Sequence, residues 1–503
     1  MSSSSNPGSG ARRARRARRR ERSGIAALAL AIVGVLLPGL GYLLAGRRRL
    51  GAVLVTLSLT LYGAAAYLAL ARRDDVITWA LNPDVLLLMV VALGVIALYW
   101  VTVLVTSYKM LRPLTAGPGA RLAGSAVIGL VCFGMASSTA LGAQTLMAQR
   151  QLVEKVFSGE QSKSQTRPKI NNTKDPWAQF PRLNILLLGA DDGEGRDNTR
   201  TDSVMIASID TRTGKTALIS LARNWMRMPF PEGTALHKEF PTGFWDPNGL
   251  KEQPNYYLDA MYRMVPAEHR DLIGPSDNPG ADVLKMSVSE ALGLKLHYYV
   301  QVNLAGFAQL VEALGGITVN INYKVPVGGN DDKKIPPSRY LDPGPNRHLN
   351  GTDALWFARG RYKVQGADVA RQARQRCTVK AIVERATPQN VLANYLDLAK
   401  AGESLIRTDI PQTILPAFVT LGQRIKNGAI TNIDLDKKKN YPSGRNPNYA
   451  AMRQLIQQHL NPPTKPATPK PTAPKPTAPA TRKPNPKPTT PDLAEACAYN
   501  PTG

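Results

Sequence analysis

Four apolar runs between residues 25 and 147 place the strongest constraint on how this chain folds. The runs cover residues 25–45, 51–71, 84–106 and 122–147. Each approaches the roughly 20 residues that an α-helix needs to cross the hydrocarbon core of a bilayer. No small-residue cleavage site follows the first run, so it does not resemble a signal peptide that is removed. We therefore expect a helical, multi-pass membrane anchor at residues 25–147.

The charges beside these runs predict which of them cross the membrane. Arginines in the N-terminal tail mark the cytoplasmic side, yet an arginine cluster at residues 47–49 directly follows the first run. Pro38 and Gly39 can break this run at membrane depth. We expect residues 25–45 to dip into the plasma membrane and return, and the next three runs to cross it, which places the chain after residue 150 outside the cytoplasm. Four full crossings would instead return it to the cytoplasmic side.

The net charge of +26 is concentrated in the two tails of the chain. Residues 12–22 carry eight arginines and one glutamate, and residues 462–491 carry six basic groups and no acid, so the tails supply 13 of the 26 charges. The middle of the chain is only mildly basic, which argues against a nucleic-acid partner. We expect a disordered basic cytoplasmic tail at 1–24 and a disordered tail rich in Pro, Lys and Thr at 436–503.

Strand and helix patterns begin after a polar linker at residues 148–180. Buried strands are predicted at 184–189, 203–209, 216–221, 298–302 and 316–322. Helices are predicted at 281–292, 304–314, 368–386 and 388–426. Strands that alternate with helices imply an α/β domain in which helices flank a mixed central sheet. We place this domain at residues 181–435.

Two acids and an arginine lie at neighbouring strand ends of the predicted sheet. Asp191 ends the first strand, Asp202 begins the second, and Arg223 follows the third. Ligands gather at loops along one edge of such a sheet, so these side chains can meet there. Carboxylate oxygens, together with substrate phosphates and water, suit Mg²⁺. Turn chemistry explains the sequence Asp191-Asp192-Gly193 equally well, so the metal site depends on the whole combination.

A second group of arginines follows an apolar run that Asn350 can cap as a helix. The stretch carries one acid, Asp368, with Arg359, Arg361, Arg371, Arg374 and Arg376. Guanidinium groups are planar, bidentate donors that suit phosphate oxygens. A solvated basic helix is the alternative interpretation. An apolar run that leads directly into the arginines favours a fixed cluster that faces a polyanion.

Several other chemistries lack their motifs in this sequence. There is no P-loop, no Gly-x-Ser-x-Gly elbow and no His-Glu-x-x-His motif, so P-loop nucleotide hydrolysis and the hydrolase and zinc-protease classes have no support. The three cysteines, Cys132, Cys377 and Cys497, show no metal-binding spacing. A Cys377–Cys497 disulfide can form outside the cell, but the sequence does not favour it.

Taken together, these segments resemble the LytR-CpsA-Psr family of bacterial envelope proteins. The matching segments occur in one order between residues 183 and 386, and they begin at Asn184, Arg200, Ser220, Tyr298 and Leu349. The resemblance implies an extracytoplasmic domain behind a membrane anchor. It also implies a phosphotransferase that uses Mg²⁺ to move a glycopolymer from a polyprenyl-pyrophosphate carrier onto peptidoglycan.

The resemblance also implies a role for each candidate residue. Asp191 and Asp202 match the acids that hold the metal or orient the arginines. The arginines that grip the pyrophosphate match Arg223, Arg359, Arg361 and Arg374. The acid and base of the final motif match Asp368 and Arg371. Either Asp191 or Asp368 could act as the general base, and the lipid chain would need an apolar groove between the sheet and the helix at 304–314.

The chain departs from the family pattern in three ways. The family commonly has Pro-Arg-Asp where this chain has Ala222-Arg223-Asn224, which removes an acid that would support Arg223. The arginine usual after the first acid is absent, and Arg196 is the nearest substitute. The multi-pass anchor differs from the single helix that is most common. Two other classes stay open: a non-catalytic envelope scaffold that binds the same polymers, and a membrane-tethered transcriptional regulator suggested only by the basic tails.

Overall fold

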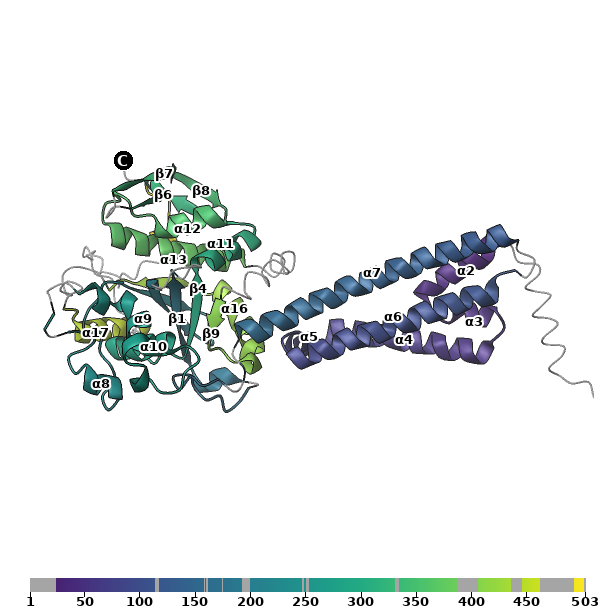
Figure 1. Cartoon of the computed structure of the whole chain (residues 1–503), viewed down its shortest axis with the longest axis horizontal. Helices are drawn as coiled ribbons and strands as arrows, with labels where there is room; N and C mark the ends of the chain where they lie inside the picture. Colours follow the sequence, from purple (N-terminus) through teal and green to yellow (C-terminus); the bar gives the residue numbers. More distant parts are fainter. Residues whose placement is uncertain are drawn as a thin grey trace, which may run out of the picture. The chain divides into compact units, whose positions relative to one another are not determined.

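A computed structural model of the chain divides it into two compact units, Met1–Val153 and Glu154–Gly503 (Figure 1). It describes residues 24–501 apart from gaps at 114–116, 158, 160–161, 174, 192–199, 247, 250–252, 331–333, 387–405, 436–445 and 462–492. Arg196 and most of the two predicted tails lie outside the described residues.

The first unit is helical. Its helices are α2 (Gly24–Leu36), α3 (Leu40–Leu44), α4 (Arg48–Ala71), α5 (Arg73–Ala80), α6 (Pro83–Leu111) and α7 (Pro118–Val156). Among the described residues, α4, α6 and α7 are the helices long and apolar enough to cross a membrane. Leu88, Leu98 and Leu130 are strongly exposed on them. An apolar surface of this extent is typical of a bundle that faces lipid.

The first apolar run is interrupted, as Pro38 and Gly39 predicted. α2 ends at Leu36, and Gly39 adopts a left-handed φ of 100° just before α3. Side chains of α4 and α6 donate to the carbonyls at the break: Trp100 Nε1 to Val35 at 3.2 Å, Tyr62 to Leu36 at 2.8 Å and Ser58 to Pro38 at 3.3 Å. Such bonds allow a helix to break at membrane depth, because they give donors to these three carbonyls in place of water.

The broken segment runs along α6 in one direction and then returns. Its contacts in chain order are Ala31 with the cluster containing Tyr108, Val35 with Trp100, Gly41 against Ser107, and Tyr42 with Thr106. From Tyr108 to Trp100 a helix rises about 12 Å, at about 1.5 Å per residue. A bilayer core is about 30 Å thick, so this rise is less than half of it. The broken segment therefore folds back along α6.

The second unit is built on a six-stranded mixed sheet in the order β10-β3-β2-β1-β4-β9. The strands are β1 (Arg182–Ala190), β2 (Thr201–Asp210), β3 (Thr216–Leu221), β4 (Tyr298–Asn303), β9 (Ile406–Thr408) and β10 (Ile430–Ile433). β1 pairs antiparallel with β2 and parallel with β4, and β2 pairs antiparallel with β3. The predicted mixed sheet and its first four strands are confirmed.

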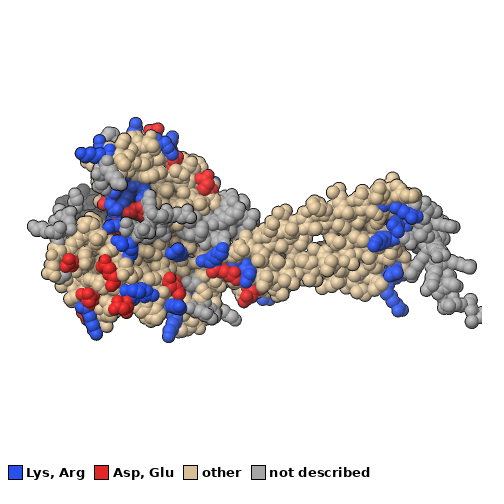
Figure 2. All heavy atoms as spheres, in the orientation of Figure 1, with Lys and Arg blue, Asp and Glu red and all other residues tan. Residues whose placement is uncertain are grey.

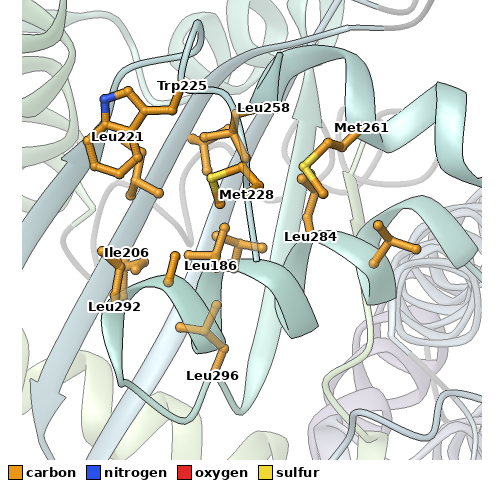
Figure 3. Close-up of a cluster of buried hydrophobic side chains, with 14 of the residues drawn as sticks. Leu186, Ile206, Leu221, Trp225, Met228, Leu258, Met261, Leu284, Leu292 and Leu296 are labelled. Atoms are coloured by element: carbon orange, nitrogen blue, oxygen red, sulfur yellow. The ribbon is translucent and has the colours of Figure 1, made fainter. Parts of the chain in front are cut away.

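One face of this sheet carries the larger core. Helices α9 (Leu258–Glu268), α10 (Pro279–Leu292) and α17 (Tyr449–Leu460) contribute to it. Leu186 of β1, Ile206 of β2, Met261 of α9 and Leu284 of α10 all belong to this core (Figure 3). Ile456 of α17 is fully buried in the same cluster. The prediction that the domain ends at 435 and that a disordered tail follows is therefore wrong for α17.

The other lobe packs α11 (Leu304–Ala313), α12 (Gly351–Arg359) and α13 (Ala367–Arg385) against two small hairpin sheets. These sheets pair β5 (Ile317–Ile321) with β8 (Gly344–Leu349) and β6 (Val325–Asn330) with β7 (Ile335–Leu341). Asn350 caps α12 as predicted, since its side chain accepts from the Asp353 amide. The remaining helices are α8 (Ala235–Glu239), α16 (Leu415–Asn427), α18 (Leu493–Ala496) and four 3₁₀ turns at Pro176–Gln179, Pro254–Tyr256, Arg270–Leu272 and Gln412–Ile414.

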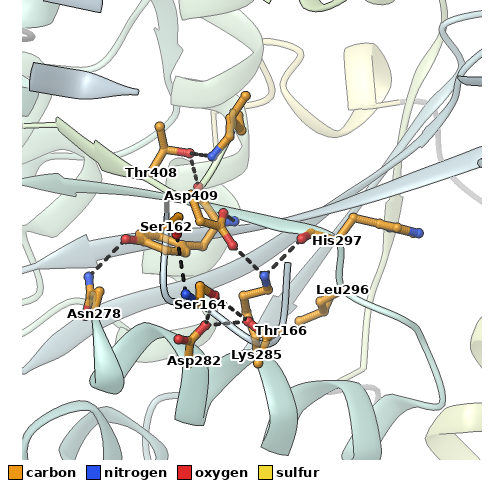
Figure 4. A network of polar contacts seen from close by, with 12 residues as sticks. Ser162, Ser164, Thr166, Asn278, Asp282, Lys285, Leu296, His297, Thr408 and Asp409 are labelled. Carbon is orange, nitrogen blue, oxygen red and sulfur yellow. Dashed lines mark hydrogen bonds and ion pairs between the residues drawn. The ribbon is translucent and has the colours of Figure 1, made fainter. Parts of the chain in front are cut away.

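Two other predicted segments differ in part from the structure. The helix predicted at 388–426 is confirmed as α16 from Leu415 to its end at Asn427, but it is wrong at 406–408, where β9 pairs with β4. The linker predicted at 148–180 is partly structured. α7 continues to Val156, and Ser164 donates to the buried Asp282 at 2.6 Å. Figure 4 shows this contact beside the buried Lys285–Asp409 ion pair, whose atoms lie 2.6 Å apart.

Cys377 and Cys497 form a disulfide, which the sequence analysis did not favour. The bond joins α13 to the C-terminal segment across 120 residues of sequence. Asn320 of β5 also binds the Cys497 carbonyl at 2.9 Å, and Leu493 is buried. Spacing alone could not reveal this pairing, because the two cysteines approach only when the chain returns after a long Pro-rich stretch.

Candidate active site

The predicted acids and arginines of the sheet edge meet around Asp202. Arg223, which follows β3, places its Nη1 3.0 Å from Asp202 Oδ1. Arg359, the last residue of α12, places its Nη2 3.1 Å from Asp202 Oδ2 and 3.1 Å from Asp191 Oδ2. At this edge of the sheet, the Asp191 amide donates a hydrogen bond of 2.9 Å to the Arg200 carbonyl. Segments far apart in sequence therefore converge at one point, as predicted.

The arginines keep Asp202 ionised. Burial by itself raises the pKa of this carboxyl, but Arg223, Arg359 and Arg371 more than offset it and hold the pKa below its usual range. Arg223 responds in the opposite sense: burial lowers its pKa, and the nearby acids raise it above its ordinary value. The site is thus a network of fixed, opposite charges that are largely removed from water. Figure 2 shows basic and acidic side chains gathered together on the second unit.

The start of α13 adds a second acid–base pair to this network. Arg371 Nη2 lies 3.2 Å from Asp368 Oδ1. The side chain of Arg371 is only 5% exposed, whereas that of Asp368 is 40% exposed. Burial lowers the pKa of Arg371, Asp368 opposes the shift, and Arg223, Asp202 and Arg361 also act on it electrostatically. The solvated-helix interpretation is therefore wrong for this arginine.

Arg374 does not join the network, although its spacing predicted that it would. Its Nε donates to the Phe357 carbonyl at 2.6 Å, and its guanidinium also binds the Gly360 carbonyl. Burial lowers its pKa. Residues three apart share a side of a helix, but a long side chain can turn toward a neighbouring element instead. Arg374 holds the end of α12 and in that way positions Arg359.

Two further contacts tie α13 to the sheet, one of them through Arg376, which was expected in the arginine cluster. Arg376 Nη1 donates to Ser220 Oγ of β3 at 3.3 Å. Ser203 Oγ of β2 donates to Gln375 Oε1 at 3.2 Å. These bonds fix the helix above the strand ends that carry Asp202.

Asp259, near the start of α9, is the most important site residue that sequence reasoning missed. Its side chain lies 3.4 Å from Arg200 Nη1 and 3.9 Å from Arg223 Nη1. Burial raises its pKa, which the two arginines oppose. This acid supplies the support of Arg223 that Asn224 does not. The sequence does offer one signal for this residue: Asp259 is a carboxylate on the apolar side of the helical pattern at 258–265.

An apolar cavity of about 200 Å³ lies beside the network. It lies on the sheet face that α11, α12 and α13 cover, in the position predicted for a lipid groove. Asp202 and Arg359 belong to its wall. The apolar part of the wall includes Leu187, Met205, Val300, Val302, Leu304, Phe307, Leu310 and Ile382. A charged head and an apolar tail of one ligand could therefore occupy adjoining regions.

The residues present fit a magnesium ion only in part. Among the described residues, no group of three or more His, Cys, Asp and Glu side chains is arranged to hold a metal. Asp191 and Asp202 do converge, since both contact the same Arg359 nitrogen. Mg²⁺ commonly takes one or two carboxylates and completes its shell with substrate phosphates and water. The donor set therefore suits Mg²⁺ in company with a phosphate ligand.

Comparison with known proteins decides the family. The sequence profile of the LytR_cpsA_psr family matches residues 146–461. The chain belongs to the LytR-CpsA-Psr family. The matched range extends past residue 435 and takes in α17, which agrees with the packing of that helix into the LytR-CpsA-Psr core.

Curated relatives are about a quarter identical to this LytR-CpsA-Psr protein over the residues that align. One from Enterococcus faecalis, named polyisoprenyl-teichoic acid–peptidoglycan teichoic acid transferase TagU, is 26% identical over 56% of this chain and 78% of its own length. One of the same name from Oceanobacillus iheyensis is 28% identical over 50% of this chain and 67% of its own length. Biofilm regulatory protein A of Streptococcus mutans is 26% identical over 54% of this chain and 60% of its own length.

Solved structures that resemble the chain include two Tag proteins, TagV and TagT. Bacillus subtilis TagV is 22% identical, with a TM-score of 0.37 over 56% of this chain and 97% of its own. A structure titled TagT bound to LI-WTA is 18% identical, with a TM-score of 0.37 over 61% of this chain and 97% of its own.

Proposed function

We propose that this protein is a membrane-anchored phosphotransferase that moves a glycopolymer from a polyprenyl-pyrophosphate carrier onto peptidoglycan. The observation that carries the proposal is the meeting of Arg223 and Arg359 on Asp202, beside an apolar cavity whose wall includes Asp202 and Arg359. A lipid pyrophosphate has the matching chemistry, with a doubly phosphorylated head and a long apolar tail. The names of the curated TagU relatives support the same reaction.

The arginines would act on the charge that develops during transfer. A pyrophosphate diester builds negative charge on its leaving phosphate, which here is the lipid phosphate. Guanidinium groups that are fixed beforehand stabilise that charge, and one such arginine can contribute about 10³-fold or more to the rate. Asp202 orients Arg223 and Arg359 for this task, and Arg374 fixes the helix end that carries Arg359.

Mg²⁺ belongs to this proposal as a cofactor. When bound, it would supply positive charge next to the phosphate oxygens. Asp191 and Asp202 are the residues that would hold it. Activity that persists unchanged after removal of divalent cations with EDTA would exclude this part of the proposal.

The acceptor would be a sugar hydroxyl of peptidoglycan, which must lose a proton as it attacks. The two candidate bases, Asp191 and Asp368, differ in access. The Asp368 side chain is 40% exposed and the Asp191 side chain is 21% exposed. The more exposed carboxylate is easier for an incoming polymer to reach, which favours Asp368 as the base.

We also propose that the second unit lies outside the cytoplasm. Three helices can cross a membrane, and a segment that dips and returns adds no crossing. With an odd number of crossings, the two ends of the anchor lie on opposite sides of the membrane. The Cys377–Cys497 disulfide favours the same side, because disulfides persist in oxidising compartments.

A transfer assay tests the function. Full-length protein in detergent is mixed with a lipid-linked glycopolymer, Mg²⁺ and peptidoglycan, and release of polyprenyl phosphate is measured. Release together with polymer attached to peptidoglycan is expected, and R359A should lower the rate by about 10³-fold. Binding of the lipid without release would contradict catalysis and identify a scaffold.

A further inference from the structure

We infer that Arg200 is a further phosphate-binding residue of this site and that Asp259 is its positioning residue. The inference rests on the proposed function, because it assigns both residues to the same pyrophosphate. It adds a third guanidinium to those of Arg223 and Arg359, and it gives the buried Asp259 a role in ligand binding.

Arg200 occupies the sheet edge where the site lies. It immediately precedes β2, and its carbonyl accepts the bond from the Asp191 amide. Its side chain is 32% exposed, so it can reach a ligand from solvent. Arg200 therefore shares its position with the acids that hold Arg359.

The bonds that hold Arg200 leave part of its guanidinium available. Its Nη1 lies 3.4 Å from Asp259 Oδ1 and 3.3 Å from the Pro254 carbonyl. A guanidinium has five N–H donors arranged as a planar fork. Both of these bonds use Nη1. Among the described residues, no hydrogen bond of the Nε and Nη2 donors is seen. Those donors suit the oxygens of a phosphate.

Asp259 fixes the guanidinium in place. It is 2% exposed, and its two carboxylate oxygens face different arginines, Oδ1 toward Arg200 and Oδ2 toward Arg223. Its amide also donates to the Arg223 carbonyl at 3.0 Å. A buried carboxylate is stable only when its charge is paired, so it holds both arginines close to itself. One acid thus sets the separation of two phosphate-binding side chains.

The test measures binding of farnesyl pyrophosphate to full-length protein in detergent with Mg²⁺, by calorimetry. The variants are R200Q, D259N and the double variant. R212Q is the matched control, because Arg212 is exposed and follows the far end of β2. R200Q should raise Kd about tenfold or more, since it removes charge-assisted hydrogen bonds. R212Q should leave Kd unchanged.

The double variant tests positioning. If Asp259 acts through Arg200, D259N should raise Kd on its own and add much less in the R200Q background. A purely structural role for Asp259 would instead lower the melting temperature and leave Kd of the folded protein unchanged. Fully additive effects would overturn the positioning role.

Failure of this inference differs from failure of the proposed function. If R359A abolishes binding while R200Q stays within about twofold of the wild-type Kd, the proposed function stands and the role of Arg200 is overturned. If the wild-type protein does not bind farnesyl pyrophosphate, or if R359A binds normally, the proposed function itself fails.

Discussion

At the scale of single residues, burial separates the arginines that sequence spacing grouped together. Arg359 keeps 27% of its side chain exposed and faces two acids, while Arg374 is 5% exposed and binds backbone carbonyls. The sequence could predict the two helices that carry them, because apolar periodicity places Arg359 at the end of one helix and Arg374 on the next. It could not predict the direction of each side chain, which depends on the carbonyls left at a helix end.

This difference predicts separate effects of two substitutions. R374Q should lower the free energy of unfolding by about 1–3 kcal/mol, because it leaves buried carbonyls without their donor. R359Q should cost less stability, because Asp202 keeps its bond to Arg223, and should abolish binding of farnesyl pyrophosphate. Chemical denaturation and calorimetry on the two variants measure both effects. Equal loss of stability in both variants would contradict the distinction.

The buried His297 makes the free energy of unfolding depend on pH. Burial, with the nearby Lys295, lowers its pKa to about 4, while the ordinary value is 6.5. The folded state therefore disfavours the charged form, so stability is full above pH 6.5 and is lost as pH falls toward 4. The loss should be about 3 kcal/mol, at 1.36 kcal/mol per unit of pKa. H297Q should flatten this part of the profile in denaturation experiments; an equally steep profile would refute the assignment.

At the scale of elements, periodicity predicted the regular parts of the fold and missed the irregular ones. β1 to β5 and α10 to α13 have clear apolar patterns, and the structure contains all of them. The β6–β8 segment was missed because its prolines, glycines and charged residues dilute the period-two pattern. α17 was missed because it precedes the Pro-rich stretch and resembles part of the tail.

The broken helix α2–α3 predicts the topology of the anchor. Alkaline phosphatase, which is active only outside the cytoplasm, can be fused after residues 46, 81, 113 and 157. We expect activity at 81 and 157 and none at 46 and 113, because the first segment returns to its side of entry. Activity at 46 would show that the first segment crosses the membrane.

At the scale of the whole molecule, the second unit is held together by contacts that span most of its sequence. The Cys377–Cys497 bond attaches the C-terminal segment to the helix that carries Arg371. No local sequence pattern predicts such a contact. The convergence of acids and arginines could be predicted, because strand ends along one sheet edge must lie together. The partner of each charge, such as Asp259 for Arg223, could not.

The disulfide predicts a measurable share of the stability. C377S/C497S, or treatment with a reductant, should lower the free energy of unfolding by about 2–4 kcal/mol, because the bond closes a long loop. C132S is the control, since Cys132 is a free cysteine of the first unit. A melting temperature that does not respond to the reductant would show that the bond contributes little.

The most direct test of the central claim is a structure of the full-length protein with a bound polyprenyl pyrophosphate. The proposed function predicts the two phosphates against Arg223 and Arg359, and the isoprenoid chain in the cavity beside Val300 and Phe307. A pyrophosphate bound away from these arginines, or a lipid chain outside that cavity, would contradict it.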